Sequence, residues 1–113
     1  MGAGGSAVKI LLDENLPHEL RRLIAGHDVY TCRYMGWDGV QNGALLARAS
    51  AAGFDALVTT DRGIEYEQNP GALAVGVLIL HAKSNGIRHL RPLIPALLAA
   101  LATSPARVVV RVG

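Results

Sequence analysis

The chain has 113 residues, of which 50% are hydrophobic and only 4% are aromatic. This composition excludes a disordered chain, and the length suits one domain with an aliphatic core. No apolar run reaches the roughly 20 residues that a membrane-spanning helix needs. The net charge of +2 is too small to indicate a nucleic-acid partner without further signals.

The N-terminal segment and the single cysteine bear on where the protein works. Residues 1–6 are rich in glycine and lack the basic and apolar regions of a secretory signal, so we expect a flexible leader before one domain over residues 7–113. Cys32 has no partner for an internal disulfide and follows an apolar run, which predicts a small buried hydrophobic residue. Both observations favour a reducing, cytoplasmic location.

Apolar runs bounded by turn residues predict five strands. We expect them over residues 7–12, 28–32, 54–60, 75–80 and 106–112. The last strand carries arginines between its valines, which is typical of an edge strand protected by charge.

Three helices are expected between these strands, because leucines and alanines recur there at helical spacing. The first should begin at Asn15 as its N-cap, with Pro17 in its first turn, and should end at Gly26. The second should end at Gly53, and the third should run from about residue 88 to residue 102. We expect residues 33–43 to be irregular and residues 63–72 to form a loop.

The alternation of strands and helices predicts an α/β domain, a three-layer α/β/α sandwich around a mostly parallel five-stranded sheet. Asp13 directly follows the first strand and Asp61 follows the third. If these strands are neighbours, as in a flavodoxin-like order, the two aspartates flank the crevice where such sheets bind ligands.

Asp13, Glu14 and Asp61 would then form an acidic group. Carboxylates at such short range repel one another unless a cation neutralises them, and Mg²⁺ or Mn²⁺ is the natural choice. Such an ion can clamp a phosphodiester and activate water. The competing interpretation is that an aspartate here caps the helix that follows its strand, and that Glu14 is merely solvated.

Four motifs follow one another along the chain: Leu-Asp-Glu-Asn-Leu-Pro within residues 8–17, Gly-His-Asp-Val at 26–29, Asn-Gly-Ala-Leu-Leu at 42–46 and Val-Thr-Thr-Asp-Arg at 58–62. In this order and spacing they resemble the short PIN-like proteins of the DUF5615 group. The resemblance implies a Mg²⁺- or Mn²⁺-dependent ribonuclease with an acidic cluster, RNA as the substrate, and an antitoxin protein as the partner of a bacterial toxin. Assembly of the chain into a homo-oligomer is a further alternative for its partners.

The candidate site residues lie within these motifs. Asp13, Glu14 and Asp61 would bind the metal, and Asp13 and Asp61 would be catalytic. Arg62 could hold a phosphate bidentately, or pair instead with Asp61 or with Glu65. Asn15 and Asn42 would contact the substrate beside it.

Two acids that relatives carry are missing from this chain. Residues 41–44 at the start of the second helix are uncharged, and Gly63 and Ile64 follow Arg62. Asp38 is the candidate to replace them as a third catalytic acid, and Glu65 and Glu67 are further candidates.

Two other functions remain open at the level of the sequence. The missing acids favour a PIN-like binding module that has lost catalysis. A phosphoacceptor receiver domain also places acids after its first and third strands. That chemistry needs a hydroxyl after the fourth strand and a lysine after the fifth, where this chain has His81 and Gly113.

Overall fold

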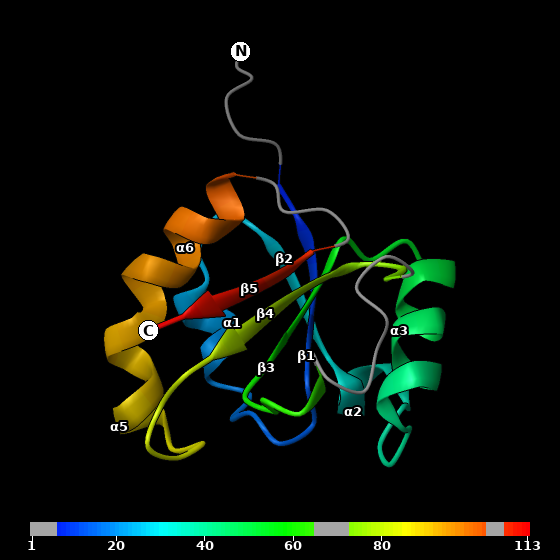
Figure 1. The fold of residues 1–113 in the computed structure, drawn as a ribbon, viewed down its shortest axis with the longest axis horizontal. Coiled ribbons are helices and arrows are strands. Elements are labelled where there is room, and N and C mark those ends of the chain that lie inside the picture. The colour runs from blue at the N-terminus through cyan, green and yellow to red at the C-terminus, as the bar shows by residue number, and fades with distance from the viewer. Residues whose placement is uncertain (1–6, 65–72, 104–107) are drawn as a thin grey trace.

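A computed structural model describes residues 7–64, 73–103 and 108–113, and the expected leader at 1–6 lies outside them. Five strands form one parallel sheet in the order β2-β1-β3-β4-β5 (Figure 1). The strands are β1 (Lys9–Leu12), β2 (Asp28–Thr31), β3 (Ala56–Thr59), β4 (Gly76–Leu80) and β5 (Val109–Val112). This is the flavodoxin-like order in which the first and third strands are neighbours, and the predicted edge position of the last strand is confirmed.

β1 lies between β2 and β3, and β3 is the central strand of the sheet. Leu12 at the end of β1 pairs with Thr31 on one side and with Val58 on the other. The backbone N–H of Asp13 continues the ladder by donating to the Val58 carbonyl at 3.0 Å. Residues that follow β1, β2 and β3 therefore emerge at the same edge of the sheet.

Helices cover both faces of the sheet, which confirms the α/β/α sandwich (Figure 1). On one face lie α1 (Leu20–Leu23), α5 (Ile87–Leu90), the 3₁₀ turn η2 (Arg91–Leu93) and α6 (Ile94–Ala102). On the other lie α2 (Cys32–Met35) and α3 (Asn42–Ala51). Because both faces are covered, β3 and β4 are buried along their whole length.

The first helix is shorter than the sequence predicts. It begins at Leu20 rather than after Asn15, and its N-cap is Glu19. Leu20 donates to the Pro17 carbonyl and Arg21 donates to the His18 carbonyl. These bonds span three residues and close tight turns, so the stretch before α1 is a series of turns in which Asn15 caps no helix. The predicted apolar stripe still packs, because Leu20 is fully buried.

The segment after β2 also differs from the prediction. Cys32 does not end the strand but begins α2, whose first turn is capped by the Thr31 hydroxyl accepting from the Tyr34 N–H at 3.0 Å. The expected irregular segment 33–43 therefore starts with one helical turn. Cys32 is 1% exposed, which confirms its predicted burial.

Two predicted segments fall partly outside the described residues, namely most of the loop 63–72 and the start of the strand 106–112. Across the ranges that are described, none of the helices combines the length and the apolar character needed to cross a membrane.

Candidate functional site

Asp13 leaves β1 at the edge of the sheet and is held there by two hydrogen bonds. The Thr59 hydroxyl donates to Asp13 Oδ2 at 2.6 Å, and the Glu14 N–H donates to Oδ1 at 2.8 Å. Asp13 is 8% exposed and Thr59 is fully buried. The carboxylate is therefore fixed in orientation before any ligand arrives.

Asp61 follows β3 and is also held through its carboxylate. Its Oδ1 accepts from the Gly63 N–H and its Oδ2 accepts from the Asn42 side-chain amide, both at 2.9 Å. The Asp61 N–H donates in turn to the Thr59 hydroxyl at 3.0 Å. One buried hydroxyl thus bonds to both aspartates, and the structure brings Asp13 and Asp61 together at one edge of the sheet, as the predicted strand order requires.

The two aspartates face a shared hollow of about 220 Å³, which we call the acidic pocket. Polar groups dominate its lining, which consists of Asp13, Glu14, Asn15, Gly39, Val40, Gln41, Asn42 and Asp61. Glu14 Oε1 accepts from the Gly39 N–H at 2.8 Å, and this bond ties the loop between α2 and α3 to the segment after β1. Asn15 and Asn42, predicted to contact the substrate, are both part of this lining.

Asp38 and Arg62 lie differently from the prediction. Asp38 is exposed and does not line the acidic pocket, because the loop approaches through the Gly39 backbone instead. Arg62 does not line the pocket either; its Nη2 lies 3.5 Å from the Ala82 carbonyl, beyond the end of β4. The structure therefore brings neither side chain to Asp13 and Asp61. Glu65 and Glu67 lie outside the described residues.

The donor set limits which metal coordination is feasible. Among the described residues, no three His, Cys, Asp or Glu side chains are grouped so that they could hold an ion. Each aspartate accepts two hydrogen bonds, which leaves about half of the four or so lone-pair positions of a carboxylate. Mg²⁺ commonly binds through one or two carboxylates, with waters and substrate phosphates completing its shell. The pair fits such a partly hydrated ion, and it does not fit an ion enclosed by protein ligands alone.

The carboxylates at this edge of the sheet affect the pKa of the buried Cys32 thiol. Burial, together with the negative charges of Asp13 and Glu14, raises the pKa of Cys32 to about 12, and burial is the larger cause. The thiol therefore stays protonated at neutral pH. Cys32 acts as a core residue here and not as a nucleophile.

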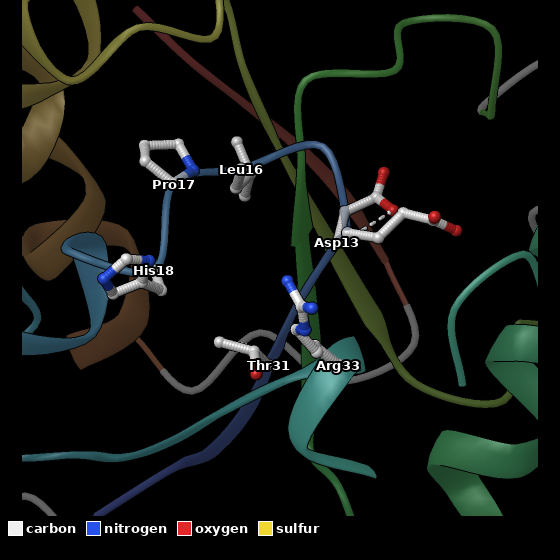
Figure 2. Close-up of a pocket in the computed structure, with 7 residues that line it drawn as sticks. Asp13, Leu16, Pro17, His18, Thr31 and Arg33 are labelled. Atoms are coloured by element: carbon white, nitrogen blue, oxygen red, sulfur yellow. Dashed lines mark hydrogen bonds between the residues drawn. The ribbon is translucent and has the colours of Figure 1, made fainter. Parts of the chain in front are cut away.

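A second hollow, of about 240 Å³, shares Asp13 and Glu14 with the acidic pocket, and we call it the Arg33 pocket (Figure 2). Its remaining lining combines apolar and basic groups: Leu16, Pro17, His18, Thr31 and Arg33. Sequence reasoning missed this pocket because Arg33 was expected in an irregular segment. The available signal was its position two residues after the end of β2, at the same sheet edge as Asp13.

Thr59 was likewise missed, although it belongs to the Thr-Thr-Asp-Arg motif. A threonine at the end of a buried strand gives no sign of which neighbour its hydroxyl will bind. The structure places it between the two aspartates.

Comparison of the chain with protein-family models, with curated proteins and with solved structures gave no match. The resemblance to the PIN-like group thus depends on the motifs alone.

Proposed function

We propose that this protein is a PIN-like ribonuclease that depends on Mg²⁺ or Mn²⁺ and cleaves RNA at the acidic pocket. The observation that carries the proposal is the pair Asp13 and Asp61, held at the ligand-binding edge of a parallel sheet by a common hydroxyl, that of Thr59. The order and spacing of the motifs give independent support. When bound, the ion would stabilise the charge that develops on a phosphodiester and would activate a water molecule.

The residues of the chain prepare the site for this chemistry. Thr59 fixes the orientation of Asp13, and the Asn42 amide fixes that of Asp61, so that two negative charges face the pocket without rearrangement. Gln41 and Asn15 line the same pocket, and their amides can donate hydrogen bonds to phosphate oxygens. Binding of a divalent ion relieves the repulsion between the carboxylates.

The decisive variant is Asp61→Asn, which keeps the shape of the side chain and removes one negative charge. We expect it to abolish cleavage of labelled single-stranded RNA in Mn²⁺ and to leave the fold intact. Asp28→Asn is the matched control. Asp28 is an exposed aspartate at the start of β2, so it lies at the opposite ends of the strands from Asp61. EDTA should abolish cleavage by the wild type.

Equal cleavage by wild type and Asp61→Asn would assign the activity to a contaminant or to another site. Cleavage that persists in EDTA would exclude the metal-dependent reaction. Circular dichroism of the variants tells loss of activity apart from loss of structure.

A second candidate is a PIN-like module that binds RNA without cleaving it. Two observations favour it: among the described residues no three ligating side chains are grouped, and Glu14 is engaged by the Gly39 N–H. Calorimetric titration with Mn²⁺ separates the two functions. Undetectable Mn²⁺ binding together with retained RNA binding would favour the module over the enzyme.

Two further assignments carry less support. A toxin paired with an antitoxin protein is proposed from the resemblance alone, and co-expression with a small neighbouring gene product would test it. The receiver-like alternative is disfavoured because the chain leaves β4 at His81 and β5 at Gly113, where phosphoacceptor chemistry needs a hydroxyl and a lysine.

A further inference from the structure

The Arg33 pocket has a composition different from that of the acidic pocket, although Asp13 and Glu14 belong to both. Leu16 and Pro17 give it an apolar side, and His18 and Arg33 give it basic groups. Figure 2 shows the Arg33 guanidinium reaching from α2 into the space that these residues enclose. A pocket with an apolar side and a cation suits a ligand that has both an anionic group and an apolar ring.

Among the described residues, the basic groups of this pocket have no bonding partner. In the parts of the chain that the structure describes, no hydrogen bond or ion pair engages the Arg33 guanidinium or the His18 imidazole. The neighbouring carboxylates have other partners: Asp13 accepts from Thr59 and from the Glu14 N–H, and Glu14 accepts from Gly39. A guanidinium beside an acidic site that pairs with neither acid is available to a ligand.

We propose that the Arg33 pocket binds one unpaired nucleotide of the RNA strand, next to the phosphodiester held at the acidic pocket. This inference rests on the proposed function and names the form of its substrate. Arg33 would receive a phosphate through the paired N–H groups of its guanidinium, a geometry that lysine lacks. Leu16 and Pro17 would contact the sugar or the face of the base, and the His18 ring could stack on the base.

The position of Asp13 between the two pockets would determine which phosphodiester of a bound strand lies at the acidic pocket. Because Asp13 borders both pockets, a strand that lies across it places adjacent units on its two sides. Arg33 is then a positioning residue, which sets the register of the strand without touching the reacting phosphate. Paired nucleotides of a duplex are stacked and cannot turn into such a recess, so the pocket selects single strands.

The test measures binding of a short fluorescein-labelled single-stranded RNA by anisotropy in EDTA, so that cleavage does not interfere. We expect Arg33→Ala to weaken binding about tenfold, equivalent to about 1.4 kcal/mol. The slope of log affinity against log salt should fall by about 0.7, the value for one phosphate contact with a single strand. Arg48→Ala removes an equal charge from the exposed face of α3, outside both pockets, and should change affinity less than twofold.

Arg33→Lys tests the geometry and also covers the case in which the alanine variant fails to fold. It keeps the charge and loses the paired donors, so its affinity should fall between those of wild type and Arg33→Ala. The same RNA annealed to its complement should bind wild type more weakly and respond less to Arg33→Ala.

Each result bears on one proposal at a time. Equal affinity in wild type and Arg33→Ala, or an equal loss in Arg48→Ala, would overturn the role of the pocket even if Asp61-dependent cleavage is observed. Equal effects on duplex and single strand would overturn the selection of unpaired nucleotides. Loss of binding in Arg33→Ala without cleavage by the wild type would support the pocket and contradict the enzyme.

Discussion

At the scale of single residues, Thr59 is the side chain on which the candidate site most depends. It is fully buried, and its hydroxyl donates to Asp13 and accepts from the Asp61 N–H. Thr59→Val keeps the shape and leaves a buried carboxylate oxygen and an N–H without their partner. We expect the free energy of unfolding to fall by about 1–3 kcal/mol in urea denaturation, and any cleavage to fall with it.

Thr60→Val is the matched control for this prediction. Thr60 is the next residue, is less buried, and bonds to the exposed side chain of Asn85 rather than to an aspartate. Its substitution should cost less than about 0.5 kcal/mol, as is usual at the surface. Comparable losses at both positions would show that the hydroxyl of Thr59 has no special part in the site.

Cys32 makes a prediction about alkaline stability. Its pKa is raised to about 12 in the folded protein from an ordinary value of 9.0, because burial and nearby carboxylates disfavour the thiolate. Between these two values the unfolded chain has lost the proton and the folded chain keeps it, so stability falls as pH rises through this window. Cys32→Ser should flatten this part of the curve of unfolding free energy against pH. An unchanged slope would contradict the raised pKa.

At the scale of elements, α6 anchors one helical layer to the sheet. Leu97 is fully buried on α6, in the same apolar cluster as Ile10 and Leu12 of β1. Leu97→Ala should therefore lower the unfolding free energy by about 2–5 kcal/mol.

Leu98, the next residue, provides the control for this prediction. Leu98 is only partly buried, at the margin of the same cluster, so Leu98→Ala should cost clearly less. Equal losses at the two positions, measured by thermal or urea denaturation, would contradict the packing of the Leu97 face against the sheet.

The elements that the sequence predicted best are those with long apolar runs. The apolar run before Asp61 predicted a buried strand. The leucines at helical spacing predicted the last helix, which the structure describes as α5, η2 and α6 in succession. The first helix was predicted too long because Asn15 and Pro17 are also good turn residues. Local patterns do not separate these two uses.

The candidate site could likewise be predicted only in part. The meeting of Asp13 and Asp61 could be predicted because the parallel strands β1 and β3 end at one edge. The position of Asp38 outside the acidic pocket could not be predicted, because it depends on a hydrogen bond from the Gly39 N–H to the Glu14 side chain, 25 residues away. The Arg33 pocket was missed for a similar reason, since its lining comes from segments on either side of α1.

At the scale of the whole molecule, the sheet divides the protein into two apolar clusters, and both pockets lie at the edge where β1, β2 and β3 end. This arrangement separates stability from binding. Residues such as Leu97 are buried between the layers, and residues such as Arg33 are exposed at a pocket. Variants at the rim should therefore change ligand affinity with little effect on unfolding.

The bond between Asp13 and Thr59 joins positions 46 residues apart, across strands that are neighbours in space and not in the chain. Such a contact forms only after a long loop has closed, at a cost in chain entropy. A nascent or partly folded chain then has both carboxylates but no site. The acidic pocket therefore forms together with the pairing of β1 and β3, and a chain in which these two strands are unpaired lacks it.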